Sequence, residues 1–322
     1  MNDASAEISI VREIGSCLGD SGLIVHDLRY SSSRSRIFYA TSSPGNAPLA
    51  IKLFTDGTSY PQIEAVQSID KDMRRYGEFS VPEPIYMSDD GSVVVTEWVE
   101  AESLRTILRR HGFPISKILS FSNRAGRWLR HFHRTVRTSP GNLKTKQLLE
   151  DLEDELKQLR NAGTGFPKAI EKAHAALVSS ASWVAREPVS QGQIHGDFKP
   201  DNILISESRT VGIDFSLEFR NVVVLDLAHF INHLILHTYE PRAFRWFYSR
   251  HIIMNAFVQG YTDKSTILNS STLAWIRLFY FVRMWCGQVV RSKIEMSSFY
   301  LCKAICHEIN ILLAGRTLSL PN

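Results

Sequence analysis

The chain has 322 residues, of which 44% are hydrophobic and 22% are charged, and its formal net charge at pH 7 is +4. This composition is that of an ordinary globular protein, and the length predicts about two domains or one large two-lobed unit. A chain of this size buries enough surface to fold without disulfide bonds or structural metal ions. Its cysteines show no paired metal-binding spacing, which indicates reduced core thiols: Cys17, Cys286, Cys302 and Cys306.

Signals for secretion or membrane insertion are weak. The N-terminal sequence MNDASAEISIVREIGS lacks the basic start and the apolar run of a signal peptide. The most apolar stretch, at 273–291, is interrupted by Arg277 and Arg283, so it predicts a buried amphipathic helix and no transmembrane segment. We therefore expect a cytoplasmic protein.

Strands dominate the first third of the chain. Short runs rich in apolar and β-branched residues predict strands at 22–30, 36–42, 49–54 and 92–99, and SSPGNAP before the third is a turn. Between the third and fourth strands, PQIEAVQSIDKDMRRYG starts with a proline and carries apolar residues at helical spacing, which predicts a helix.

The pattern changes to helical beyond Ala101. Amphipathic stretches predict helices at 102–111, 115–137, 146–160 and 167–186, a β-like island follows at 192–225, and helices resume to the C-terminus. This order predicts a two-lobed α+β protein. We expect a β-rich, nucleotide-binding N-lobe at 1–99 and a helical lobe at 100–322 that carries the catalytic loop and the acceptor site, joined by TEWVEAESL.

The β-like island carries the strongest chemical pattern. QIHGDFKPDNILI contains Asp197 and, five residues later, Asn202, and TVGIDFS places Asp214 twelve residues beyond Asn202. Apolar residues bracket both halves, so we expect both acids at the ends of a small hairpin. Phosphoryl transfer needs such a set, because one carboxylate accepts the proton of the acceptor hydroxyl while an amide oxygen and a second carboxylate hold Mg²⁺. The alternative is a polar turn capped by Asp and Asn.

At these residues the sequence resembles the aminoglycoside phosphotransferase and choline kinase family of the protein-kinase-like superfamily. Protein kinases carry His-Arg-Asp here, whereas the small-molecule branch usually carries His-Gly-Asp, as this chain does at His195–Asp197. The resemblance implies a bilobal fold with a small β-rich N-lobe and a larger helical C-lobe. It also implies that ATP binds in the cleft, that Asp197 is the catalytic base, and that Asn202 and Asp214 are the magnesium ligands.

Two residues upstream extend the resemblance. Lys52 in LAIKLF stands where the superfamily places the lysine that contacts the α- and β-phosphates. Glu64 in the next predicted helix is the expected partner of Lys52. The gap between them is short for the family, so Asp56 and Glu78 remain alternative partners.

The hinge and the phosphate loop have weaker patterns. TEWV resembles the family's hinge, where the carbonyl of Glu97 and the amide of Val99 would hold adenine; backbone recognition leaves ATP and GTP undistinguished. The glycine-rich phosphate loop is replaced by RYSSSRSRIFYA. Ser33 and Arg34 are its candidate phosphate contacts, Arg36 is an alternative to Arg34, and a solvated turn is the other interpretation.

Downstream, the pattern separates this chain from regulated protein kinases. The metal-binding triplet reads Asp-Phe-Ser, no Ala-Pro-Glu element follows, and only LEFRNVV separates the triplet from the segment that carries Asp226. In the family this Asp begins a helix and supports the catalytic loop through backbone hydrogen bonds. Lys199 keeps a Ser/Thr protein kinase open as an alternative, and the altered phosphate loop keeps a nucleotide-binding pseudokinase open.

The phosphate acceptor is the least defined part of the prediction. Residues 105–146 hold eleven lysines and arginines and no carboxylate, which favours an anionic ligand or surface, or else forms a solvated basic face. The following LLEDLEDELKQLR is acidic and would suit a cationic acceptor or an exposed helix. No nucleic-acid-binding motif accompanies the basic residues. We therefore expect ATP- and Mg²⁺-dependent transfer to a small-molecule hydroxyl, on an aminoglycoside, an amino alcohol, a sugar or a related metabolite.

Overall fold

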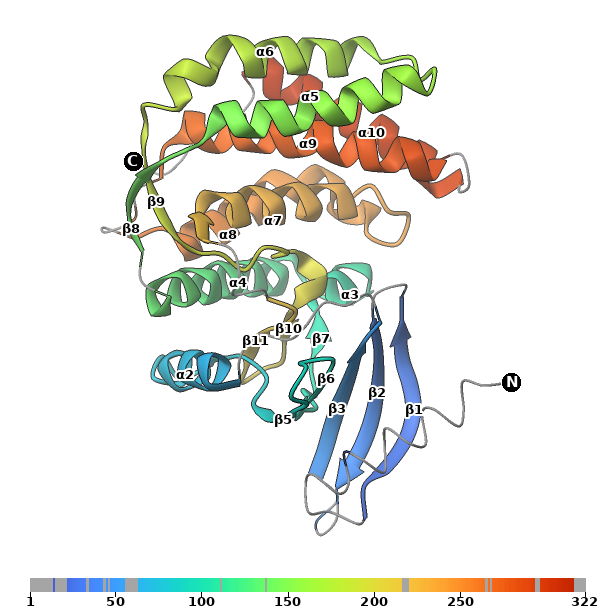
Figure 1. Cartoon of the computed structure of the whole chain (residues 1–322), viewed down its shortest axis with the longest axis vertical. Coiled ribbons are helices and arrows are strands. Elements are labelled where there is room, and N and C mark those ends of the chain that lie inside the picture. The colour runs from blue at the N-terminus through green and yellow to red at the C-terminus, as the bar shows by residue number, and fades with distance from the viewer. Residues whose placement is uncertain are drawn as a thin grey trace. The chain divides into compact units, whose positions relative to one another are not determined.

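The chain forms two compact units in the computed structural model. Unit 1 comprises Met1–Ala101 and Ser206–Ile213, and unit 2 comprises Glu102–Ile205 and Asp214–Asn322. Unit 1 is rich in strands and unit 2 in helices (Figure 1). The structure describes residues 14, 22–32, 35–42, 45, 47–55, 63–110, 112–136, 138–215, 220–263, 266, 268–292 and 296–315.

An antiparallel sheet forms the core of unit 1. Its strand order is β1-β2-β3-β6-β5, with β1 at Ile24–Ser31, β2 at Ser35–Ser42, β3 at Ala47–Phe54, β5 at Pro84–Met87 and β6 at Val93–Glu97. Ile51 and Leu53 of β3 are buried in one apolar cluster with Phe38 and Val95. Because successive side chains of a strand point to opposite faces, Lys52 lies on the face opposite this cluster.

A helix and a parallel strand pair complete unit 1. Helix α2 (Ile63–Arg74) buries Val66, Ile69 and Met73, the positions that the helical spacing predicts. Strand β4 (Phe79–Ser80) pairs in parallel with β11 (Thr210–Gly212), although the two lie far apart in the sequence.

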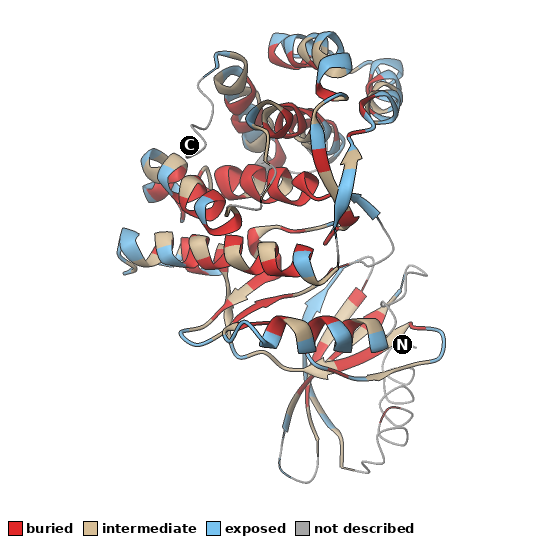
Figure 2. Cartoon of the chain, turned by 90° about the vertical axis from the view of Figure 1, so that its left-hand side faces the viewer, coloured by how far each residue is buried: buried red, intermediate tan, exposed pale blue. Residues whose placement is uncertain are grey.

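Helices dominate unit 2. They are α3 (Leu104–Arg109), α4 (Ile115–Thr135), α5 (Thr145–Asn161), α6 (Lys168–Val184), α7 (Val224–His237), α8 (Arg250–Tyr261), α9 (Ser270–Ser292) and α10 (Met296–Leu313), with 3-10 turns η1 (Pro200–Asn202) and η2 (Phe244–Ser249). Helix α4 packs on α8, α7 contacts both α8 and α9, and α5, α6 and α10 pack around α9 (Figure 1). Buried and exposed residues alternate along these amphipathic helices (Figure 2).

Short strands connect the helices of unit 2. Strand β7 (Glu102–Ser103) pairs with β10 (Ile203–Ile205), and β9 (Pro188–Gln193) pairs with both β8 (Ser139–Asn142) and β12 (Arg220–Val222). The loop from the end of β9 to the start of β10 therefore holds the predicted catalytic residues.

Helix α9 contains the most apolar stretch of the sequence. Arg277 and Arg283, which interrupt this stretch, both have partners: Arg277 is 3% exposed and donates from Nε to Asn232 Oδ1, and Arg283 pairs with Glu155. The prediction of a buried amphipathic helix is confirmed. Among the helices of the described residues, none is long and apolar enough to cross a membrane.

Helices α4 and α8 meet through two glycines. A Cβ atom on Gly126 would lie 2.0 Å from the carbonyl oxygen of Phe257, and a Cβ on Gly260 would lie 2.0 Å from that of Asn123. Both distances are far below van der Waals contact, so the backbones approach as closely as only glycine permits.

We expect Gly260→Ala to lower the free energy of unfolding by about 1–3 kcal/mol, because the added methyl group forces α4 and α8 apart. This loss exceeds the gain in helix propensity, which is about 1 kcal/mol at most. Urea denaturation measures the difference. The matched control is Gly287→Ala on α9, where an added Cβ meets nothing within 4 Å. Equal stability of the two variants would contradict the close packing.

Candidate active site

Asp197, Lys199 and Asn202 are in direct contact in the loop after β9. Oδ2 of Asp197 accepts hydrogen bonds from Lys199 Nζ at 2.6 Å and from Asn202 Nδ2 at 3.0 Å, and Asn202 Nδ2 also donates to the Asp197 carbonyl at 2.9 Å. The Asp197 side chain is 47% exposed. Its Oδ1 accepts no hydrogen bond from the described residues, so one carboxylate oxygen is available to an incoming hydroxyl.

The start of this loop is fixed by Asp226, in the first turn of α7. Its buried carboxylate accepts from the backbone amides of His195 at 2.7 Å and Gly196 at 3.0 Å, and from His133 Nε2 at 3.0 Å. Gly196 has a φ of 84°, which favours glycine. Burial by itself would raise the pKa of the Asp226 carboxyl, but the hydrogen bond and charge of His133 hold this pKa below its usual value. Asp226 is therefore an ionised anchor.

The His195 ring is enclosed by aromatic side chains. Trp128, Phe132, Phe198 and Phe215 lie with ring centroids 5.2–6.0 Å from that of His195. Burial lowers the pKa of His195, so the imidazole is uncharged at neutral pH. His195 is therefore part of the aromatic core next to Asp197.

Asp214 follows β11 and has a φ of 58°, the one positive φ of a non-glycine residue among those described. A strained backbone at a carboxylate is typical of a functional position. The charges of Asp226, Asp197 and Asp214 act to raise the pKa of His195, against the larger effect of burial, which lowers it.

The donor set fits a hard divalent cation. Asn202 is almost fully buried, and its Nδ2 is held by Asp197, so the opposite Oδ1 of the amide points away from Asp197. This oxygen accepts no hydrogen bond from the described residues. An amide oxygen together with the carboxylate of Asp214 is the kind of ligand pair that Mg²⁺ prefers.

The structure describes only some of the predicted phosphate-binding residues of unit 1. Lys52 is half-buried, and its ammonium lies 4.9 Å from the ring centroid of Phe54. Glu64 is exposed in the first turn of α2, and within the described part of the chain no ion pair joins it to Lys52. Ser33, Arg34 and the alternative partner Asp56 lie outside the described residues.

The predicted hinge residues are Glu97, the last residue of β6, and Val99, two residues beyond it. The amide of Trp98 donates to Pro48 O at 2.9 Å, which continues the β3–β6 pairing past Glu97. Thr96 Oγ1 donates to the carbonyl of Glu97 at 3.2 Å. The amide of Val99 donates to no atom of the described residues, so it is available to a ligand.

Sequence reasoning missed the residue that fixes the Glu97 side chain. Arg209, just before β11, donates to Glu97 at 2.7 and 3.2 Å and to Ser80 Oγ at 3.0 Å. Burial opposes ionisation of Glu97, but the Arg209 guanidinium holds the pKa of this carboxyl below its usual value. Nothing in the sequence near Glu97 points to a partner 112 residues away.

His229 was also missed. It lies on α7 one turn after Asp226, and its Nδ1 lies 3.2 Å from the Phe198 carbonyl oxygen and 4.0 Å from Asp197 Oδ1. The helical spacing from Asp226 could have indicated it, because residues three positions apart lie on one face of a helix.

The basic segment at 105–146 does not form a continuous free face. Many of its cations have carboxylate partners in unit 2: Arg105 with Asp201 and Glu240, Arg109 with Glu240, Arg110 with Glu102, and Arg130 and Arg134 with Asp263. Burial and the neighbouring arginines lower the pKa of His131 on α4 to about 4.

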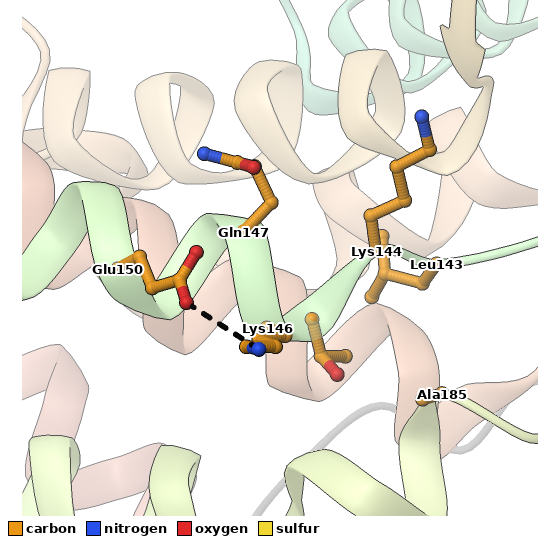
Figure 3. Close-up of a pocket in the computed structure, with 7 residues that line it drawn as sticks. Leu143, Lys144, Lys146, Gln147, Glu150 and Ala185 are labelled. Atoms are coloured by element: carbon orange, nitrogen blue, oxygen red, sulfur yellow. Dashed lines mark ion pairs between the residues drawn. The ribbon is translucent and has the colours of Figure 1, made fainter.

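A surface hollow of about 430 Å³ lies at the end of this segment, at the start of α5 (Figure 3). Lys146 pairs there with Glu150 at 3.9 Å. The hollow is lined by Leu143, Lys144, Thr145, Lys146, Gln147, Glu150 and Ala185, and includes no residue of the catalytic loop.

Comparison with known proteins decides the family. The model of the phosphotransferase enzyme family matches residues 29–245, which is more than half of the chain. The chain belongs to this family. No curated protein matches this chain. The predicted membership of the aminoglycoside phosphotransferase and choline kinase branch is confirmed.

Solved structures of similar fold are kinases. A choline/ethanolamine kinase family protein from Mesorhizobium loti has a TM-score of 0.59 at 12% identity, covering 96% of this chain and 94% of its own. An amicoumacin kinase in complex with AMP-PNP and Ca²⁺ has a TM-score of 0.58 at 13% identity, covering 96% of both chains. A Plasmodium vivax ethanolamine kinase has a TM-score of 0.53 at 12% identity, covering 94% of this chain and 86% of its own. The phosphotransferase-family chain thus has the predicted α+β, protein-kinase-like fold.

Proposed function

We propose that this phosphotransferase-family chain transfers the γ-phosphate of ATP, with Mg²⁺, to a hydroxyl group of a small molecule. The observation that carries the proposal is the catalytic loop, where Lys199 and Asn202 hold one oxygen of Asp197 and no described residue donates a hydrogen bond to the other. The Asp226 carboxylate fixes the start of this loop by accepting hydrogen bonds from the amides of His195 and Gly196. This is an arrangement for orienting a hydroxyl and accepting its proton.

The transfer is a direct displacement. The acceptor oxygen bonds to the γ-phosphorus, the bond from this phosphorus to the departing ADP breaks, and the hydroxyl proton passes to Asp197. Asn202 and Asp214 are the proposed Mg²⁺ ligands, and the bound ion would offset the negative charge of the phosphates.

We assign nucleotide binding to residues of unit 1. Lys52 is the proposed phosphate contact, with Glu64 as its partner, and Ser33 and Arg34 belong to the proposed phosphate loop. The carbonyl of Glu97 and the available amide of Val99 are the proposed adenine contacts. The ion pair of Glu97 with Arg209 supports this role, because it fixes the strand end that carries both backbone groups.

A Ser/Thr protein kinase is the second candidate. The contact of Lys199 with Asp197 favours it, because Ser/Thr kinases place a lysine at this position. The short connection opposes it, because only five residues separate Asp214 from the start of β12, too few for a protein-kinase activation segment.

The test is ADP release from ATP with a panel of aminoglycosides, amino alcohols, sugars, sugar phosphates and a generic protein substrate, with and without Mg²⁺. We expect turnover with one small-molecule class, dependent on Mg²⁺ and lost in Asp197→Asn. Phosphorylation of the protein substrate alone would support the second candidate. Magnesium-dependent ATP binding without any transfer would indicate a pseudokinase and contradict the proposal.

A further inference from the structure

The free oxygen of Asp197 defines where the acceptor must approach. Lys199 and Asn202 hold Oδ2, so the acceptor hydroxyl has to meet Oδ1. The imidazole of His229 lies beside Oδ1: its Nδ1 is 4.0 Å away, and its side chain is 17% exposed. The side chains around His229 therefore form the wall that the acceptor contacts.

Hydrogen-bond partners fix the tautomers of His229 and His233 on α7. The Phe198 carbonyl can only accept, so His229 Nδ1 donates to it, over 3.2 Å. His229 Nε2 must then accept from His233 Nε2, which lies 3.1 Å away. His233 Nδ1 remains as a lone-pair acceptor, and it has no hydrogen-bond partner among the described residues.

Both imidazoles are uncharged in this state. Burial lowers the pKa of His229 and lowers that of His233 well below its ordinary value. The His229 side chain is 17% exposed, and His233 is also only partly buried. The pair thus offers a lone-pair acceptor without adding charge.

Tyr280 of α9 completes the wall. Its ring centroid lies 5.3 Å from that of His229, and no hydrogen bond engages its hydroxyl within the described part of the chain. Burial, with the nearby carboxylates, raises the pKa of Tyr280, so the phenol keeps its proton and can donate.

The charged side chains near His233 pair with one another. His237, the next histidine along α7, lies between Asp201 and Glu240, and Arg105 also pairs with both carboxylates. Burial would lower the pKa of His237, but these two carboxylates raise it and favour the cationic imidazole. No uncompensated carboxylate therefore stands beside the histidine pair in the described residues.

We propose that His229, His233 and Tyr280 form the acceptor wall of the active site and select an uncharged polyhydroxyl molecule of the sugar or polyol class. His233 Nδ1 accepts from one hydroxyl, the Tyr280 hydroxyl donates to another, and a neighbouring hydroxyl reaches Asp197. A polycationic acceptor finds no unpaired carboxylate on this wall and meets the positive charge of Lys199. This inference rests on the proposed phosphotransfer activity.

Acceptor kinetics test the wall. With glucose, myo-inositol, glycerol, choline and kanamycin as probes, we expect the best uncharged polyol to exceed both cations in kcat/KM by about tenfold or more. His233→Leu should raise KM for that polyol about tenfold, through loss of the hydrogen bond between the polyol and His233 Nδ1, with kcat and ATP binding little changed. His233→Gln, which keeps an acceptor oxygen, should recover most of the affinity. His174→Leu on α6 is the matched control and should behave as wild type.

Calorimetric binding of the polyols in the presence of AMP-PNP and Mg²⁺ gives a readout that does not need turnover. Weaker binding in His233→Leu, recovered in His233→Gln, would support the wall. Preference for choline or kanamycin, or the absence of polyol binding to a protein that binds AMP-PNP, would overturn it while leaving phosphotransfer standing. Failure to bind nucleotide with Mg²⁺ would overturn the proposed function itself.

Discussion

Asp197→Asn is expected to lower turnover by about 10²–10⁴-fold, with nucleotide binding little changed. The amide cannot take the hydroxyl proton, and general-base catalysis contributes about this much to a rate. The fold should persist, because the Asp197–Lys199 ion pair is half-exposed and such pairs contribute about 1 kcal/mol or less. Steady-state ADP release and AMP-PNP binding measure the two effects separately.

The matched control is Asp154→Asn, which removes an exposed carboxylate of α5 that lies outside the proposed site. It should leave both turnover and binding unchanged. Near-normal turnover of Asp197→Asn would show that Asp197 is not the base.

Asp226→Asn should destabilise unit 2 by about 2–5 kcal/mol and reduce turnover through displacement of the catalytic loop. The carboxylate serves three donors, the amides of His195 and Gly196 and the imidazole of His133. An Asn side chain turns an NH₂ group toward at least one of them, which leaves a buried donor without a partner. Chemical denaturation gives the stability, and ADP release gives the turnover.

Tyr261→Phe tests the outermost hydrogen bond of the same network, which joins Tyr261 to His133. It removes only the hydrogen bond between the phenol and His133 Nδ1, at 3.0 Å, so we expect a loss of about 0.5–1.5 kcal/mol. A cost for Asp226→Asn no larger than that for Tyr261→Phe would contradict the anchoring role of Asp226.

The catalytic loop could be predicted because its residues are close in the sequence. Asp197, Lys199 and Asn202 lie within one short segment, so their spacing already specifies a contact. The order of strands and helices predicted an α+β protein, the resemblance implied the kinase-like fold, and this fold is confirmed. The pairing of Lys52 with Glu64 is harder to predict. No local sequence pattern fixes the direction of an exposed carboxylate at the start of α2.

The backbone contacts of Asp226 with the loop are those that the resemblance implied, but the side-chain partners of Asp226 and Glu97 could not be predicted, because they lie in distant parts of the chain. His133 and Asp226 are 93 residues apart, and Arg209 and Glu97 are 112 apart. Helical and strand periodicities report which face is buried and carry no information on which buried polar group meets which partner. The basic segment shows the same limit, because Asp263, Glu240 and Asp201, which pair with its arginines, all lie far downstream.

Locating the transferred γ-phosphate tests the proposed phosphotransfer directly. The protein would be incubated with γ-labelled ATP, Mg²⁺ and the acceptor panel, and the label would then be located. We predict label in one small-molecule product, none of it in the chain, and its loss in Asp197→Asn. Label found only in protein, only in inorganic phosphate, or equally in the Asp197→Asn sample would contradict direct transfer to a small-molecule hydroxyl by Asp197.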